Sequence, residues 1–217
     1  MKRKLRKALA LSLLGLLLLF AVSGRHSRRW FRPFSGSLAS RLPRERAPVV
    51  YGEPGALQSR DHGVRVAVSL RSIYFDDGDT VKITWSGGTA EEVRILGIDA
   101  PEIAHKNRGR PLGQKEGPDA VAFARKAFGQ AKTIELLRAD RLDKYGRTLG
   151  YFFLDGRNFS ELIIEARLAY ETVSAYGSNG LRSEAAGVLS AARKVGTPSF
   201  EDPSAFRKRL KETSGAK

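Results

Sequence analysis

Alternating apolar and polar positions in the middle of the chain predict three β-strands in quick succession. The alternating segments are rich in β-branched residues, which are typical of strands that bury one face. The three segments are residues 64–75, 81–85 and 91–98. Gly87 and Gly88 predict a turn between the second and third strands.

Apolar residues recur with helical spacing from residue 117 onward. One apolar stripe is formed by Ala120, Phe123, Ala124, Ala127 and Phe128. Pro118 and Asp119 are typical of a helix start, so we expect a helix over residues 117–131. The remaining predicted elements are strands over 133–139 and 148–154 and helices over 158–169 and 181–196.

This order of elements predicts an α+β fold that is mainly β. Five strands with helices between and after them suggest a small closed barrel, since closure leaves no unpaired strand edge. We therefore expect a five-stranded OB-fold Greek-key barrel with three packed helices. Residues 200–217 are polar and basic, and we expect a frayed basic tail there.

The N-terminal segment has the pattern of an export signal. The basic segment 1–7 precedes an uncharged apolar run over residues 8–24. This run is somewhat long for a signal-peptide core and somewhat short for a membrane span. A cleaved signal peptide and an uncleaved membrane anchor both remain open for residues 1–24. In either case we expect an extracytoplasmic domain, secreted or anchored to the membrane through residues 8–24.

The length of 217 residues suits one domain with extensions. Residues 25–62 contain Pro and Gly without a sustained period, and they predict a linker with little structure of its own. The folded domain is expected over residues 63–199, followed by the tail over 200–217.

The composition narrows the possible chemistry. The chain has no Cys, which excludes disulfides and thiolate catalysis, and only three His, which disfavours a structural zinc site. We expect any bound metal ion to be a hard cation with oxygen ligands. Of the formal net charge of +15, +9 lies in residues 1–32 and +6 in the remainder. A basic surface favours polyanions such as nucleic acid, although charge alone equally fits simple solubility.

The segment FDDGDT, residues 75–80, places three carboxylates around a turn. Asp77 followed by Gly78 is a strong hairpin-turn signal and needs no further explanation. Asp79 stands at the start of the next strand, and like charges so close together favour a compensating cation. A metal role for Asp79 and a simple turn both remain open.

A second acidic pair occurs in the segment RILGIDAPE, residues 94–102. Asp99 and Glu102 flank Pro101, which fixes its own backbone and restricts the residue before it. Two carboxylates on a stiff arc suit a site where one binds a metal and the other orients a water. Solvated loop carboxylates are the simpler alternative. Arg94 precedes Asp99 by five residues, which on a straight strand places the two side chains on opposite faces.

The segment DKYGR, residues 143–147, places Arg147 directly before a strand. Arginine forks match the geometry of phosphate oxygens. An ordinary surface turn accounts for this segment equally well when it is taken alone.

Together, DGDTVKI, RILGIDAPE and DKYGR resemble the staphylococcal nuclease (thermonuclease) family in their order and separations. The resemblance spans about residues 64–198. It implies an SNase-like OB-fold domain in which Ca²⁺ binds the carboxylates of Asp79 and Asp99 and the backbone carbonyl of Ala100. It further implies that Glu102 is the general base or orients the attacking water. The residues expected to clamp the scissile phosphate are Arg94 and Arg147.

The resemblance also implies substrate contacts. Lys144 and Tyr145 match positions that contact a neighbouring phosphate of the bound nucleotide. Tyr176 is a candidate for stacking on a base, and simple packing is the open alternative. The basic, Gly-rich loop over residues 104–117 is expected to be either substrate-facing and mobile or merely solvated.

The function implied by the resemblance is a calcium-dependent endonuclease. Such an enzyme is a hydrolase that cleaves DNA and RNA at the P–O5′ bond and leaves 3′-phosphate ends. We expect a monomer acting on single-stranded or locally opened nucleic acid. Two alternatives remain, a non-catalytic nucleic-acid-binding OB module and a membrane-tethered basic adaptor.

Overall fold

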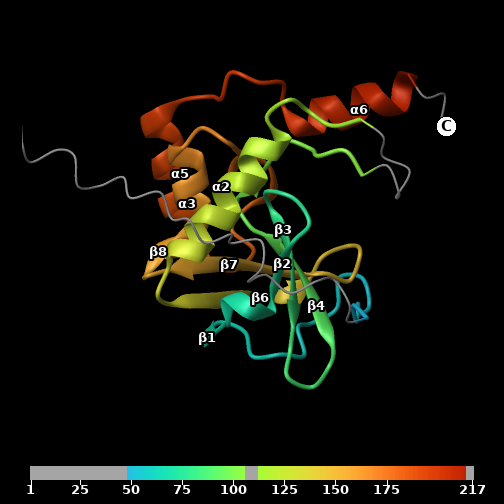
Figure 1. Ribbon diagram of the computed structural model, residues 1–217, viewed down its shortest axis with the longest axis vertical. Coiled ribbons are helices and arrows are strands. Elements are labelled where there is room, and N and C mark those ends of the chain that lie inside the picture. The colour runs from blue at the N-terminus through green and yellow to red at the C-terminus, as the bar shows by residue number, and fades with distance from the viewer. Residues whose placement is uncertain (1–47, 106–111, 214–217) are drawn as a thin grey trace, which may run out of the picture. The chain divides into compact units, whose positions relative to one another are not determined.

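The computed structural model describes residues 48–105 and 112–213, and its centre is a β-sheet (Figure 1). The sheet has seven strands in the order β1-β6-β7-β4-β3-β2, with β8 paired to β7. Their bounds are Arg65–Ala67 (β1), Ile73–Phe75 (β2), Thr80–Thr84 (β3), Ala90–Ile95 (β4), Ile134–Leu142 (β6), Thr148–Leu154 (β7) and Arg157–Asn158 (β8). A separate ladder pairs β5 (Ile98–Asp99) with β9 (Tyr170–Glu171). With the helices beside it, this sheet confirms the α+β, strand-rich class.

The strand pairings do not confirm a closed five-stranded barrel. All pairs in the large sheet are antiparallel except β4 and β7, which run parallel with Arg94 opposite Leu149. The order ends at β1 on one side and at β2 on the other, and these two edges do not pair. The predicted strand over 64–75 is interrupted by a 3-10 helix at Leu70–Ser72. Its two halves can therefore pair with different neighbours, β1 with β6 and β2 with β3.

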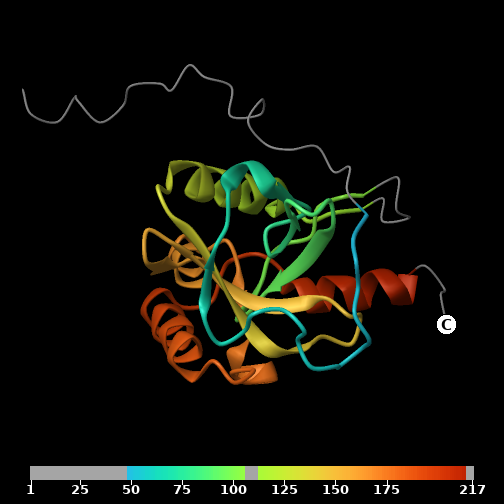
Figure 2. The ribbon, with the colours of Figure 1, turned by 90° about the horizontal axis from the view of Figure 1, so that it is seen from below.

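Five α-helices accompany the strands within the described residues, where three were predicted. Their bounds are Gly117–Gln130 (α2), Phe159–Glu165 (α3), Val173–Tyr176 (α4), Arg182–Val195 (α5) and Pro203–Thr213 (α6). α3 packs against both α2 and α5 beside the sheet, whereas α6 lies apart from these helices (Figures 1 and 2). Every helix in residues 48–105 and 112–213 is too short or too polar to be a membrane-spanning segment.

Aromatic rings fill the core between α2 and the sheet. The ring of Phe128 in α2 packs edge-on against those of Phe75, Phe152 and Phe159, with centroids between 5.0 and 5.2 Å apart. All four rings are buried, and edge-to-face packing of this kind adds to the stabilisation from burial alone. The predicted apolar stripe of α2 therefore faces the core.

Part of the predicted linker lies against the domain. The backbone N–H of Gln58 donates to the carbonyl of Asp140 at 2.8 Å. The side-chain amide of Gln58 donates to Thr148 Oγ1 at 3.1 Å, and Gln58 is buried. Residues 48–62 form no helix or strand, yet these contacts of single residues hold part of the segment against the domain. The predicted leader, residues 1–24, lies outside the described residues.

The predicted frayed tail is also ordered over much of its length. Residues 203–213 form α6, whose first turn is capped by Asp202 Oδ1 accepting a hydrogen bond from the N–H of Ala205 at 2.9 Å. Phe206 is the apolar anchor of this helix and is buried. The polar composition concealed the helix, since only Pro203 and Phe206 of its residues are buried.

A buried ion pair joins β4 to β6. Glu91 and Arg138 are 1% and 2% exposed, and Nε and Nη2 of Arg138 each donate to the Glu91 carboxylate at 2.8 Å. Thr148 Oγ1 and Trp85 Nε1 also donate to it, at 2.6 and 2.9 Å. Burial raises the pKa of Glu91, but Arg138, Thr148 and Arg60 together lower it below its ordinary value. This network ties together the strands that carry the site described below.

Arg138→Met is expected to lower the free energy of unfolding by about 3–5 kcal/mol, because the Glu91 carboxylate would stay buried without its cation. The matched control is Arg157→Met. Arg157 is 64% exposed and pairs with Glu165 at the surface, where such pairs contribute about 0–1 kcal/mol. Urea unfolding followed by tryptophan fluorescence measures both variants. Equal losses in the two would contradict a structural role for the buried pair.

Candidate active site

A cleft of about 810 Å³ lies where the turn before β3, the end of β4, strand β5 and the turn between β6 and β7 meet. Eight of the nine predicted site residues line it: Asp79, Arg94, Asp99, Glu102, Lys144, Tyr145, Arg147 and Tyr176. The ninth, Ala100, is buried and reaches the site through its backbone. The fold thus brings side chains from distant parts of the sequence into one hollow.

A turn between β4 and β5 brings Asp99 back to Arg94. Leu96 and Gly97 form this turn, in which Gly97 has a φ of +79°. Nη2 of Arg94 donates to Asp99 Oδ1 at 3.1 Å and to a backbone carbonyl of β5 at 3.1 Å. The predicted strand over 91–98 is confirmed over 91–95 and is interrupted at residues 96–97, and this turn is the physical reason why the two side chains can meet.

Asp79 is the second carboxylate on Arg94. It is 6% exposed and forms an ion pair with Nη1 of Arg94. Asp79 Oδ2 accepts a hydrogen bond from the N–H of Ala100 at 2.7 Å. Asp77 Oδ1 accepts from the N–H of Asp79 at 3.2 Å, as the predicted turn requires. The guanidinium of Arg94 therefore connects the DGDT turn to β5, and one peptide N–H connects it to the residue after β5.

Arg94 lies among charges of both signs. Burial lowers its pKa from the ordinary value, while Asp99 and Asp77 raise the pKa and Arg147 and Arg207 lower it. The guanidinium stays charged, as arginine does throughout proteins. Several arginines close enough to repel one another favour a bound anion such as phosphate in the cleft.

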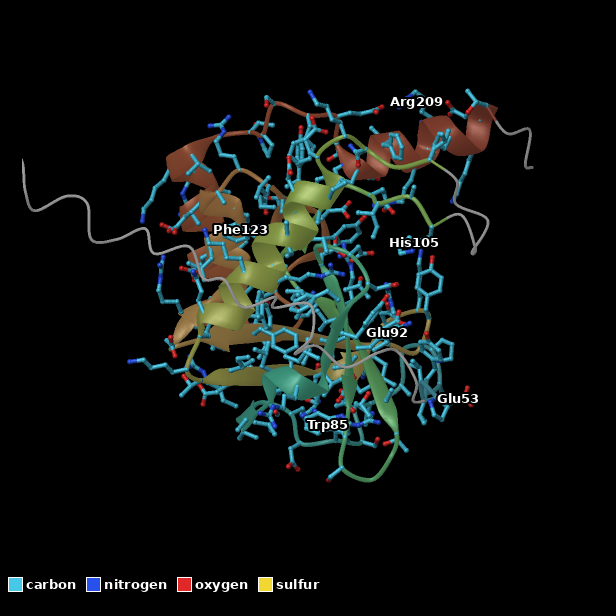
Figure 3. All side chains as sticks on the ribbon, in the orientation of Figure 1. Glu53, Trp85, Glu92, His105, Phe123 and Arg209 are labelled. Atoms are coloured by element: carbon cyan, nitrogen blue, oxygen red, sulfur yellow. The ribbon has the colours of Figure 1, made fainter. Side chains whose placement is uncertain are left out.

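Asp143 holds Arg147 in place at the DKYGR turn. Its Oδ1 accepts from the N–H groups of Tyr145 and Arg147 at 2.8 and 2.9 Å, and its Oδ2 accepts from Arg147 Nε at 2.7 Å. Arg147 Nη1 lies 3.9 Å from a carboxylate oxygen of Glu92, which is labelled in Figure 3. The side chain of Arg147 is thus oriented through Nε and lines the cleft.

Gln114 fixes the backbone of Glu102, a role that the sequence analysis missed. The N–H of Glu102 donates to Gln114 Oε1 at 3.1 Å, and the N–H of Gln114 donates to the Glu102 carbonyl at 2.8 Å. Gly117 permits this approach, since a Cβ there would lie 2.4 Å from the Glu102 carbonyl oxygen. Residues 112–117 of the predicted Gly-rich loop are therefore tied to Glu102, while 106–111 lie outside the described residues.

A third arginine reaches the cleft from α6. Arg207 Nη1 donates to Asp99 Oδ1 at 3.1 Å and to Glu102 Oε1 at 2.7 Å, and its Nη2 donates to Asp99 Oδ2 at 2.7 Å. Burial lowers the pKa of Arg207, but the two carboxylates raise it by more. Sequence alone did not indicate Arg207, because the polar composition of residues 200–217 predicted a frayed tail.

Two groups of residues could hold a cation beside this cleft. The predicted group joins the carboxylates of Asp79 and Asp99 through their shared partner Arg94. A second group consists of Asp76, Asp77 and His105, whose ligand atoms lie within 4.8 Å of one another. Figure 3 labels His105, and its Nε2 is buried with no hydrogen-bond partner among the described residues. Hard cations prefer the all-oxygen set, whereas an imidazole nitrogen suits transition metals.

Two exposed tyrosines flank the cleft. Tyr145 and Tyr176 are 61% and 73% exposed. Lys144 Nζ lies 5.1 Å from the ring centroid of Tyr145. Tyr170, the other tyrosine near the end of α3, instead donates to the carbonyl of Phe200 at 2.6 Å and packs against that ring. Of Tyr170 and Tyr176, Tyr176 is therefore the one whose ring is available to a ligand.

Comparison with known families finds a match that covers most of the cleft residues. A family model described as "Staphylococcal nuclease homologue" matches residues 92–196. Residues 92–196 of this chain belong to the staphylococcal nuclease family. The matched part of this nuclease-family domain contains every predicted site residue except Asp79, which precedes it. Arg207 in α6 follows it.

Relatives of the nuclease-family domain include two endonucleases from Bacillus subtilis (strain 168). The SPbeta prophage-derived endonuclease YokF is 38% identical over 98 residues, covering 43% of this chain and 32% of the relative. Endonuclease YncB is 36% identical over 98 residues, covering 43% and 44%. The thermonuclease of Staphylococcus hyicus is 32% identical over 93 residues, covering 43% and 53%. The chain thus spans about a third to a half of the length of these relatives.

Gly97→Ala tests the turn that brings Asp99 to Arg94. A left-handed backbone costs an L residue about 1–2 kcal/mol, and a Cβ on Gly97 would lie 3.1 Å from the hydroxyl of Tyr151. Gly88→Ala is the matched control, because Gly88 has a φ of +76° with no atom within 4 Å of the added Cβ. We expect urea unfolding to show a larger loss of stability for Gly97→Ala. The reverse order would contradict a tightly packed turn.

Proposed function

We propose that this chain is a calcium-dependent endonuclease that hydrolyses phosphodiester bonds in DNA and RNA. The observation that carries the proposal is the meeting of three carboxylates and two arginines in one cleft of a nuclease-family domain. These residues are Asp79, Asp99, Glu102, Arg94 and Arg147. Carboxylates that can bind a cation and accept a proton, beside arginines that can bind phosphate, are the groups this hydrolysis needs. The names of the relatives support the same class of reaction.

The proposed cation ligands are the carboxylates of Asp79 and Asp99 and the backbone carbonyl of Ala100. All three donate oxygen, which suits Ca²⁺. The hydrogen bond from the Ala100 N–H to Asp79 keeps the two segments adjacent. When bound there, Ca²⁺ supplies a positive charge that polarises a phosphoryl oxygen.

Glu102 is the proposed proton acceptor for the attacking water. Its side chain is 14% exposed and lines the cleft, and Gln114 fixes its backbone. Arg94 and Arg147 would donate hydrogen bonds to the phosphate oxygens as negative charge develops on them. Water then adds to phosphorus, the P–O5′ bond breaks, the 5′-oxygen takes up a proton, and a 3′-phosphate end remains.

Exposed aromatic rings support a single-stranded or locally opened substrate. Tyr145 and Tyr176 present ring faces on which unpaired bases could stack, whereas paired bases hide theirs within the helix. Lys144 lines the cleft beside Tyr145 and would contact a neighbouring phosphate. We propose that the domain acts as a monomer.

We also propose two further properties, which concern the type of fold and the export of the chain. The domain is proposed to be a variant of the OB barrel, because the outer strands β1 and β2 belong to one continuous segment that could complete the ring. Export to a secreted or membrane-anchored form is proposed from the pattern of residues 1–24 alone.

Glu102→Gln is expected to lower the turnover of plasmid DNA and total RNA by about 10²–10⁴-fold, because the amide cannot accept the proton. Cleavage is measured with millimolar Ca²⁺ and again with a chelator, which should abolish it in the wild-type chain. Glu53→Gln makes the same chemical change at an exposed position outside the cleft and should leave the rate unchanged.

Circular dichroism and thermal unfolding show whether the Glu102→Gln chain is folded. Near-full activity in a folded variant would overturn the assignment of Glu102. Salt-sensitive binding by the wild-type chain without any cleavage would favour the non-catalytic OB module instead.

Lys144→Ala is expected to weaken nucleic-acid binding and to reduce the slope of log K against log salt by about 1, because one phosphate contact is lost. Binding is measured by fluorescence anisotropy in the Glu102→Gln background, which avoids cleavage. The control is Lys126→Ala, an equal charge change on the exposed side of α2. An unchanged slope for Lys144→Ala would exclude this phosphate contact.

A further inference from the structure

Helix α6 lies outside the residues that the nuclease family model matches, and it adds a charged side chain to the site. The family match ends at residue 196, and α6 begins at Pro203. Arg207 is nevertheless in contact with both Asp99 and Glu102, through three hydrogen bonds of 2.7 to 3.1 Å. The guanidinium of Arg207 donates to both carboxylate oxygens of Asp99, and bidentate pairs of this kind are strong.

The segment before α6 is anchored on the same parts of the domain that hold the site. Gln114 Nε2 donates to the carbonyl of Glu201 at 2.6 Å, while Gln114 Oε1 accepts from the N–H of Glu102. The hydroxyl of Tyr170, in the strand paired with β5, donates to the carbonyl of Phe200 at 2.6 Å. Phe206 is buried one residue before Arg207. The position of Arg207 is thus set by contacts of its whole segment.

A cation on Asp99 and the guanidinium of Arg207 would use the same oxygens. Arg207 contacts both Oδ1 and Oδ2 of Asp99, and Arg94 shares Oδ1. Its contact with Glu102 Oε1 occupies an oxygen that would otherwise accept a proton from water. Two positive charges on one carboxylate also repel each other at short range.

We propose that Arg207 is a further residue of this site, which competes with the metal cation for Asp99 and with the attacking water for Glu102. This inference rests on the proposed function. Arg207 then sets the affinity for the cation, and cation binding displaces its side chain from the carboxylates. Ser204, Lys208 and Lys211 of α6 also line the cleft, so bound nucleic acid would meet the same helix.

The first test is isothermal titration of the full chain with CaCl₂, without nucleic acid. Arg207→Gln is expected to lower the Kd for Ca²⁺ by about fivefold or more, because a unit charge a few ångströms from the cation is removed. Arg209→Gln is the matched control, since Arg209 (labelled in Figure 3) lies on α6 but pairs with Glu201 outside the cleft. Its Kd should stay that of the wild type. Arg207→Lys keeps the charge and should show a smaller gain than Arg207→Gln.

Asp99→Asn separates the failure of this proposal from that of the proposed function. If Asp99→Asn abolishes Ca²⁺ binding but Arg207→Gln binds as the wild type does or more weakly, competition by Arg207 is overturned and the calcium site stands. If neither the wild type nor Arg207→Gln binds Ca²⁺, both proposals fall.

Hydrogen exchange supplies a readout that a merely structural role would not move. Competition is reciprocal. If the contacts of Arg207 weaken the binding of Ca²⁺, bound Ca²⁺ should weaken those contacts by the same free energy and loosen α6. Amides of residues 203–213 are therefore expected to exchange faster when CaCl₂ is added. Unchanged or slower exchange in α6, with Ca²⁺ bound, would overturn the proposal.

Discussion

One guanidinium, that of Arg94, holds the two aspartates of the site together. Asp79 precedes β3 and Asp99 belongs to β5, and both carboxylates contact Arg94. Two carboxylates this close would otherwise repel each other. The charge of Arg94 therefore permits the sharp return of the chain at Gly97, on which the rest of the site depends.

Strand β4 supports this interaction from two faces. Glu91 points into the core and forms the buried pair with Arg138, while Glu92 and Arg94 alternate onto the other face. The parallel pairing of β4 with β7 then places Arg147 one residue before the strand partner of Val93. The same strand thus anchors the fold on one side and aligns the two arginines of the cleft on the other.

The balance of charges in the cleft is compatible with the binding of a polyanion. Arg94 and Arg207 contact Asp99, and Arg147 pairs with Asp143, so these acidic groups are compensated before any ligand arrives. A bound cation would change that balance at Asp99. A phosphate would then meet the guanidinium of Arg207 released from Asp99 and Glu102, which would link cation binding to substrate binding.

Sequence alone predicted the elements with a clear period and most of the polar residues that the fold brings together in the cleft. The α2 stripe is confirmed, because its buried residues recur at helical spacing. The strand at 148–154 is also confirmed, and it is buried over almost its whole length. The break at Leu96–Gly97 was missed, since apolar residues continue across it and only a positive φ marks the turn. Gln114 and Arg207 were missed because their roles depend on contacts across the fold that no local pattern encodes. The buried Glu91–Arg138 pair was missed for the same reason.

A crystal structure of the Glu102→Gln chain with Ca²⁺ and a short DNA strand tests the central claim most directly. We predict a cation in contact with Asp79 and Asp99, and a phosphate between Arg94 and Arg147. Anomalous scattering from a heavier lanthanide would confirm the position of the cation. A cation held instead by Asp76, Asp77 and His105, or a DNA strand bound away from the cleft, would contradict the proposed active site.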